Sequence, residues 1–263
     1  MTNIVPVHFT YVTATTAKGN TNATYTTLMN IIDGVFKSVM NDGRDVATKL
    51  RIDSAIGLNE FYSDRGTGKE ELVSTKRNEG GFVHVADVLS TDEKNRNTFK
   101  CDMLITSCTR VDADEERNLP EKVVVKGAIF DFRKSLLPVE FTALNPKAMD
   151  YFEGLDASPT NPTFTCVWGR QISQVVTRTI TEESAFGEPS VREIKSTRKD
   201  FVITGASVTP YEWDDEETMT ATELTEAIAA RETYLATIKQ RQDEYKASKN
   251  AAAATPAQSG FKF

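Results

Sequence analysis

The chain has few of the residues on which most catalytic sites depend. Its 263 residues include only two histidines and three cysteines. His8 and His84 lie far apart in the sequence, and nothing near either supports a Ser-His-Asp or Cys-His nucleophile. Cys101, Cys108 and Cys166 cannot all pair within one chain, and their spacing matches no zinc site. We therefore expect structural histidines, buried free thiols and no catalytic activity.

Recognisable phosphate and metal motifs are also missing. The run Gly66-Thr67-Gly68-Lys69 resembles a phosphate loop, but the residue at 63 is Ser rather than Gly and the residue at 70 is Glu rather than Ser or Thr. Acidic runs at 112–116 and 214–217 offer carboxylates for Mg²⁺, as a nuclease requires. Both runs read as loops, where charge is usually solvated, so a metal enzyme is the weaker alternative. We expect no cofactor.

A membrane-spanning segment is not expected either. No apolar run approaches the roughly 20 residues that cross a bilayer, and the first residues lack a charged-then-apolar signal pattern. The expected location is the cytoplasm, or the host cytoplasm if a phage encodes the protein. Net charge is -7, and seven acids without a Lys or Arg lie between Tyr211 and Glu226. A nucleic-acid surface must therefore be a local cluster of cations.

The segment from Glu121 to Arg170 carries the strongest fold signal. A β-branched run at 123–133 precedes an extended run at 137–144, a short helical pattern at 148–155 and another extended run at 164–170. Gly127 lies inside the first run, where a missing side chain permits a bulge or the sharp coiling of a closed barrel. Strands, a plugging helix and further strands in this order predict an oligonucleotide-binding (OB) barrel.

The other segments complete a mainly β, α+β chain with an antiparallel OB-like barrel. Apolar residues recur from Leu28 to Val39 at helical spacing and predict an N-terminal helix with a buried stripe. Period-two patterns from Leu50 to Val111 predict further strands. Extended runs at 173–180 and 191–204 predict a long β-hairpin arm.

A C-terminal helix is expected after the acidic segment. Thr220 and Glu223 form a capping box, and an apolar stripe follows, which Arg231 and Gln242 interrupt, so a sustained coiled coil is not expected. We expect three parts: an OB-like domain with its helix and arm at 1–210, an acidic segment and helix at 211–249, and a flexible tail at 250–263.

Aromatic residues alternate with cations along the expected strands. Single-stranded nucleic acid is bound by this combination, because bases stack on exposed rings while Lys and Arg follow the phosphates. Many of these rings also suit a barrel interior, and Phe130 and Phe132 are expected to be buried together. The candidate nucleic-acid-binding residues are Phe61, Tyr62, Arg65, Lys69, Lys76, Arg77, Phe82, Phe99, Lys100, Arg133, Lys134, Trp168, Arg170, Arg198 and Lys199.

The region from about Asn118 to Gly205 resembles a family of tailed-phage and prophage proteins. The resemblance rests on KVVVKGAIFDFRKSLLPVEF, NPKAMDYFEGLD, NPTFTCVWGRQ, EESAFGEP and TRKDFVITG. It implies a sequence-independent, OB-type single-stranded DNA-binding protein of phage replication or recombination. The chain departs from the usual bacterial single-strand binder because its last residues are Gly-Phe-Lys-Phe rather than an acidic tip.

Single-stranded DNA is therefore the expected partner. Replication or recombination proteins are expected to dock through the acidic segment or the C-terminal tail, and a homo-oligomer is left open. The alternative from another class is a structural or assembly protein of a virion, in which β-rich domains with a long arm and a flexible tail also occur.

Overall fold

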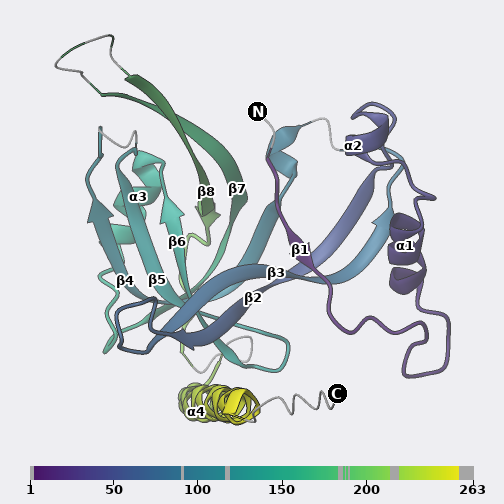
Figure 1. Cartoon of the computed structure of the whole chain (residues 1–263). Coiled ribbons are helices and arrows are strands. Elements are labelled where there is room, and N and C mark those ends of the chain that lie inside the picture. Colours follow the sequence, from purple (N-terminus) through teal and green to yellow (C-terminus); the bar gives the residue numbers. More distant parts are fainter. Residues whose placement is uncertain are drawn as a thin grey trace.

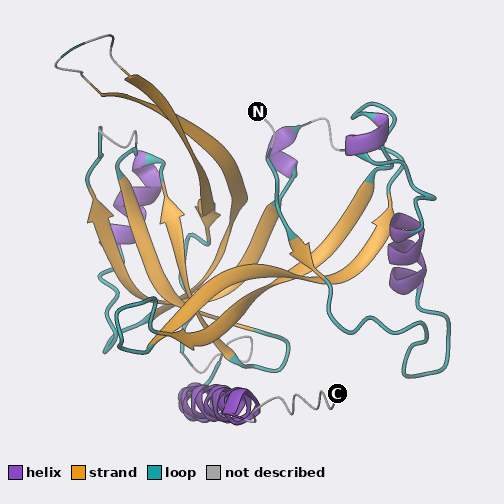
Figure 2. Cartoon of the chain, in the orientation of Figure 1, coloured by secondary structure: helices purple, strands orange, loops and turns teal. Residues whose placement is uncertain are grey.

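Five strands in the middle of the chain close into a barrel (Figures 1 and 2). The computed structural model describes residues 3–89, 92–115, 119–182, 186, 188, 190–213 and 219–254. The barrel strands are β4 (Thr98–Val111), β5 (Lys122–Phe130), β6 (Leu136–Ala143), β7 (Thr163–Glu182) and β8 (Ser190–Ala206). They follow one another around the barrel in the order β4-β5-β6-β8-β7, and β7 returns to β4.

The order of these strands is that of an OB barrel. Neighbouring strands are antiparallel except β6 and β8, which run parallel where Thr142 and Ala143 meet Val202 and Ile203. Helix α3 (Pro146–Gly154) connects the third barrel strand, β6, to the fourth, β7. The chain is therefore mainly β with an OB-like barrel, as the sequence predicts.

Two local features of the predicted segment shape the barrel. A Cβ at Gly127 would lie 2.0 Å from the carbonyl oxygen of Leu104, and the pairing of β4 with β5 shifts register beside it. The missing side chain thus permits the close approach that the curved sheet requires. At the start of α3 the Asn145 side chain accepts a hydrogen bond from the backbone N–H of Lys147. Phe152, on this helix, is buried in the core.

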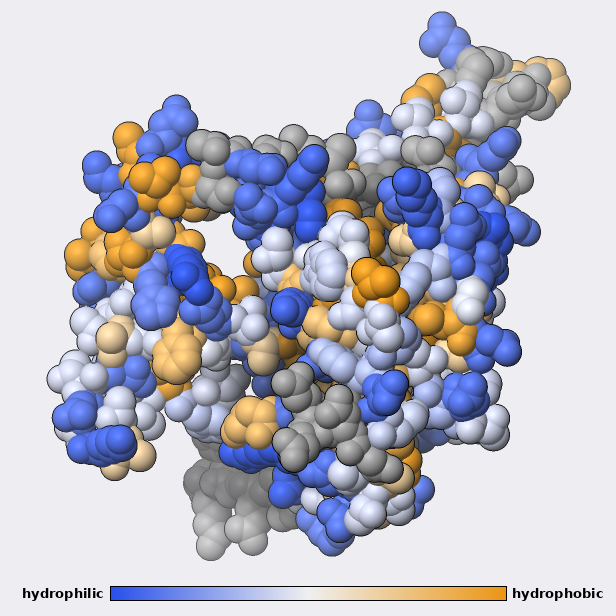
Figure 3. Space-filling model, turned by 180° about the vertical axis from the view of Figure 1, so that it is seen from behind, coloured by the Kyte–Doolittle hydropathy of each residue, from blue (hydrophilic) through white to orange (hydrophobic). Residues whose placement is uncertain are grey.

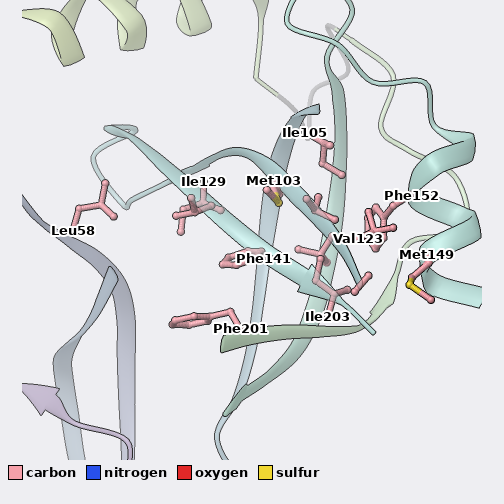
Figure 4. Packing of buried hydrophobic residues seen from close by; sticks show 14 residues of the cluster. Leu58, Met103, Ile105, Val123, Ile129, Phe141, Met149, Phe152, Phe201 and Ile203 are labelled. Carbon is pink, nitrogen blue, oxygen red and sulfur yellow. The ribbon is translucent and has the colours of Figure 1, made fainter. Parts of the chain in front are cut away.

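The hydrophobic core lies inside the barrel (Figure 4). Its buried members come from all five barrel strands, from α3 and from one strand outside the barrel. They are Leu58, Met103, Ile105, Val123, Val125, Ile129, Val139, Phe141, Ala143, Met149, Phe152, Val167, Phe201 and Ile203.

A second sheet lies beside the barrel rather than within it. Its order is β1-β3-β2, with β1 (Val7–His8), β2 (Leu50–Ser63) and β3 (Glu71–Val85). β2 and β3 form a long antiparallel ribbon that extends from the barrel (Figure 1). The period-two patterns predict strands in this region, but β3 is one strand where two runs, at 71–76 and 81–88, are expected. The patterns also do not reveal that the ribbon lies outside the barrel. The 3-10 helix η1 (Glu93–Asn95) lies on the way from β3 to β4.

The N-terminal helix differs from its prediction. Two short helices, α1 (Ala23–Ile32) and α2 (Val39–Asp42), replace the single helix expected over 28–41. Gly34, at a φ of 71°, lies just past the end of α1, where a left-handed residue commonly stops a helix. The expected buried stripe is wrong, because Ile32, Val35 and Val39 are exposed. Instead, Thr24 is the buried residue of α1, and its hydroxyl accepts a hydrogen bond from the N–H of Val83.

Beyond the barrel, β7 and β8 continue together as the expected arm (Figure 2). The backbone register pairs Ser173 with Lys199 at its base and Thr177 with Lys195 farther out. At the base, Asn3 donates from its amide to the carbonyl of Gln171 and accepts from the N–H of Ser173. The N-terminal segment thus connects the arm to β3, with which β1 pairs.

The C-terminal helix α4 (Ala221–Ala254) packs mainly on β2. Arg231 forms an ion pair with Glu60, and Gln242 binds the backbone of Tyr62. The two residues that interrupt the apolar stripe therefore help to fasten the helix to the ribbon, together with Lys239 and Lys246, which pair with Glu70. Among the described residues, no helix is both long enough and apolar enough to cross a membrane. The expected part boundaries at 210 and 249 stay predictions.

Candidate nucleic-acid interface

The fifteen candidate residues do not line one groove. They divide between the ribbon, the outer surface of the barrel, the barrel interior and the base of the arm. The side chain of Arg198 lies outside the described part of the structure.

Two candidate rings are engaged inside the molecule. Phe99 packs in the barrel, with its ring centroid 4.9 Å from that of Phe141 and 5.5 Å from that of Phe201. Tyr62 lies under α4, where the ammonium of Lys239 stands 5.4 Å from its ring centroid. Both rings therefore stabilise the fold in this arrangement rather than offer a face to a base.

Three candidate cations form ion pairs. Arg77 lies 2.7 Å from Glu79, and Lys69 lies 3.7 Å from Glu71. Lys134 binds Glu223 at the start of α4, and this lysine lowers the pKa of the Glu223 carboxyl. Arg77 and Lys69 keep close carboxylates beside them, and Lys134 helps to hold α4.

The remaining exposed candidates lie on the ribbon and in the β5–β6 turn, and they do not form one continuous surface. Phe61 and Phe82 lie on different strands of the ribbon, and Arg65 lies in the turn between those strands. Arg133 lies in the β5–β6 turn with its guanidinium 5.1 Å from the ring of Phe132. The expectation that Phe132 is buried with Phe130 is wrong, because Phe132 is 89% exposed in this turn.

Lys100, Trp168 and Arg170 are the candidates that the fold brings together; we call them the Trp168 patch. Lys100 on β4 is the direct cross-strand partner of Trp168 on β7, and Arg170 follows two residues along β7 on the same face. Trp168 is 40% exposed. A Cβ at Gly205 on β8 would lie 2.3 Å from Nε1 of Trp168, so the indole lies against backbone that has no side chain. Lys199 is exposed farther along β8, at the base of the arm.

Lys76 lies in a second candidate surface, a groove between the ribbon and the barrel. The groove has a volume of about 380 Å³ and holds Lys76, Lys126 and Glu140, with the hydroxyls of Ser74 and Thr106 beside them. Lys76 donates to the carbonyl oxygen of Glu140, and Lys126 lies 3.1 Å from the Glu140 carboxylate. We call this surface the Lys76 groove.

The position of this groove follows from the fold. β5 and β6 are the second and third barrel strands, and OB barrels bind their ligands on the face of these two strands. The ammonium of Lys76 also lies 5.8 and 5.5 Å from the ring centroids of Phe141 and Phe201. Removal from water lowers the pKa of Lys76, while the negative charges of Glu140 and Asp200 oppose the shift.

Sequence reasoning did not single out Lys126, Ser74, Thr106 or Glu140. Lys126 sits in the most β-branched run of the chain, next to Gly127, and its alternation places it on the outer face. The outward position of Lys126 could therefore be predicted. Its neighbour across the groove, Lys76, lies on the ribbon, and the sequence pattern does not show where the ribbon packs.

The thiols show no sign of reactivity. Burial raises the pKa of Cys101 to about 12 and that of Cys108 to about 11. Among the described residues, no three His, Cys, Asp or Glu side chains gather as a metal ion would require. The residues at 116 and 214–217, part of the acidic runs weighed for Mg²⁺, lie outside the described residues.

A protein-family model matches residues 4–241 of the chain. The chain belongs to the YorF family. This family is phage-associated, which agrees with the phage character that the sequence motifs imply. No curated protein and no solved structure matches the chain. For this member of the YorF family, the OB-like barrel therefore rests on strand order and pairing alone.

Proposed function

We propose that this protein binds single-stranded DNA without sequence preference and without catalysis, in phage DNA replication or recombination. The observation that carries the proposal is the Trp168 patch on the outside of an OB-like barrel, where a partly exposed indole has the exposed Lys100 as its cross-strand neighbour and the half-buried Arg170 two residues along the same strand. OB barrels bind oligonucleotides, and the phage-associated family is compatible with this role.

The chemistry of the patch suits an unpaired strand. Trp168 is held against the backbone at Gly205, so little side-chain freedom is lost when a base stacks on its exposed part. Stacking on an aromatic ring contributes about 1 to 3 kcal/mol per base and accepts every base, because each has a π face. A paired base inside a duplex does not present that face.

The Lys76 groove supplies the electrostatic half of the proposal. Its hydroxyls and its two ammonium groups lie where phosphate oxygens of a strand on the β5–β6 face would come, and in the complex a phosphate replaces the Glu140 carboxylate that Lys126 now contacts at 3.1 Å. β4 carries both Lys100 of the patch and Thr106 of the groove, so one strand borders both surfaces. Such local clusters permit binding despite the net charge of -7.

A binding titration with labelled oligo-dT and a duplex of equal length tests the proposal. We expect tighter binding of oligo-dT, with affinity that falls as salt rises. Trp168→Ala is expected to weaken binding about tenfold, within the range for one stacked base. Lys147→Ala, which removes an exposed cation of α3, is the matched control and should bind as the unchanged protein does.

Two results would contradict single-stranded DNA binding through the Trp168 patch. Equal affinity for single-stranded and duplex DNA, or no binding of either, would contradict it. So would a Trp168→Ala protein that folds normally and binds oligo-dT with unchanged affinity.

The projecting arm favours a second candidate, a structural or assembly protein of a virion. β7 and β8 stay paired from Ser173 and Lys199 out to Glu182 and Ser190, well beyond the barrel. Ordered oligomers that form in the absence of DNA and show no affinity for it would favour this candidate. Docking of replication proteins through the acidic segment or the tail is a further proposal, and residues 214–218 and 255–263 lie outside the described part of the chain.

A further inference from the structure

Apolar side chains are exposed together on α1, α2 and the residues next to them. In the space-filling view hydrophobic atoms gather at the left, over the part of the molecule that carries these helices (Figure 3). Met40 is 92% exposed and Ile32 is 74% exposed. We call this surface the α1–α2 face; its exposed members are Ile31, Ile32, Val35, Val39, Met40 and Val46.

The helix is held on β3 near its first turn, where Thr24 is buried and accepts from the N–H of Val83. Ile31 and Ile32 lie about two turns farther along α1 and are exposed there. The barrel core contains no residue of α1 or α2. An apolar pattern of helical period, typical of a buried face, is thus left uncovered in one copy of the chain.

The extent of this surface matches what a stable interface requires. Val85, the last residue of β3 on which α1 packs, and Val88, just after it, are also exposed and extend the surface. The eight side chains offer an area of the order of the roughly 800 Å² that each partner of a standard interface buries. Scattered single apolar residues are normal on a protein surface, but a set of this size marks an interaction site.

The charges around the α1–α2 face point to a second copy of the same chain as the partner. Between positions 33 and 49 there are three acids and three bases: Asp33, Lys37, Asp42, Arg44, Asp45 and Lys49. With Asp87, which lies between Val85 and Val88, these charges sum to -1, whereas the whole chain carries -7. Two negatively charged copies repel through most of their surface, and a rim that is close to neutral and carries both signs permits them to meet face to face.

We propose that the α1–α2 face is the contact surface of a homodimer related by a twofold axis. In such an interface the same patch is used on both subunits, so acids and bases of one rim lie opposite those of the other. The Trp168 patch and the Lys76 groove stay accessible in this dimer, because none of their residues belongs to the α1–α2 face. The proposal is independent of DNA binding.

Sedimentation equilibrium of the full chain without DNA tests the dimer. We expect a mass of about twice 29.2 kDa at tens of micromolar protein. Met40→Asp, which places a charge at the most exposed apolar position of the face, is expected to weaken association at least tenfold. Val208→Asp is the matched control, because Val208 is 94% exposed but lies after β8, away from α1 and α2.

Each result decides the matter. A monomer at every concentration of the unchanged chain would overturn the proposal, as would a Met40→Asp protein that stays fully dimeric. Equal dissociation by Val208→Asp would show that the effect does not depend on the α1–α2 face and would also overturn it. Circular dichroism of both variants shows that they fold, so a loss of mass reports association alone.

Discussion

Gln242 of α4 hydrogen-bonds both backbone groups of Tyr62, an edge residue of the ribbon. The amide oxygen of Gln242 accepts from the Tyr62 N–H at 2.8 Å, and its amide nitrogen donates to the Tyr62 carbonyl. Asn3 uses its amide in the same way on β7, where it joins Gln171 and Ser173. Side-chain amides thus hydrogen-bond the free backbone groups of strand edges at two places. This also hinders those edges from pairing with a strand of another chain.

The ion pair of Arg231 with Glu60 gives a first prediction about how α4 is held. The two side chains are 11% and 1% exposed, so Arg231→Ala leaves a buried carboxylate without its partner. Removal of one member of a buried pair typically costs about 3 to 5 kcal/mol, and we expect a loss of about 3 kcal/mol in the free energy of unfolding. Urea unfolding measures the loss.

Two controls separate the buried charge from a general effect on α4. Arg241→Ala removes an exposed arginine of the same helix and is expected to change stability by less than about 0.5 kcal/mol. A double variant, Glu60→Leu with Arg231→Met, removes both charges and is expected to recover most of the loss. A double variant as unstable as Arg231→Ala would rule out this explanation.

Acid is expected to loosen the far half of α4. Hydrogen bonds from Lys239 and Lys246 lower the pKa of Glu70 from 4.5 to about 2. A lowered folded-state pKa gives stability that is fully present above 4.5 and is lost as pH falls toward 2. Between pH 5 and pH 2.5 the free energy of unfolding should therefore fall more steeply for the unchanged chain than for Glu70→Gln. Parallel pH profiles would contradict the role given to Glu70.

Gly127 allows a prediction about the barrel itself. A Cβ there would meet the carbonyl oxygen of Leu104 at 2.0 Å, and backbone on both strands would have to move. Gly127→Ala is therefore expected to destabilise the fold by about 2 to 3 kcal/mol. Gly154→Ala is the control, because a Cβ at the end of α3 would meet nothing within 4 Å. Thermal unfolding of the two variants should differ clearly; equal midpoints would contradict the tight β4–β5 contact.

The barrel was predictable from the sequence because its signals are local. Gly127 marks a bulge, Asn145-Pro146 marks a helix start, and strand, helix and strand follow in the order of an OB barrel. The ribbon was harder, because β2 and β3 alternate as barrel strands do. Leu58 and Ile56 of β2 pack on the barrel core, and Lys76 of β3 donates to the carbonyl of Glu140, and these contacts join the ribbon to the barrel.

The candidate site was predictable only in part. Phe99 and Trp168 both lie on barrel strands beside cations in the sequence, yet one ring faces the core and the other lies outside. Side chains along a strand alternate between the core and the outside. Which set faces the core depends on the register of β4 with β7, and no local sequence pattern gives that register. The Lys76 groove needs Lys126 from a strand 50 positions away, a contact that arises only when the ribbon packs on the barrel.

The central claim is that the Trp168 patch contacts single-stranded DNA, and fluorescence tests it most directly. The chain has two tryptophans, and Trp213 stacks on Phe164 with ring centroids 6.5 Å apart. Trp213→Phe leaves Trp168 as the sole tryptophan, while Trp168→Phe leaves only Trp213. We predict that oligo-dT quenches the emission of the Trp213→Phe protein and leaves that of the Trp168→Phe protein nearly unchanged. Quenching confined to the Trp168→Phe protein, or absent from both, would contradict the account.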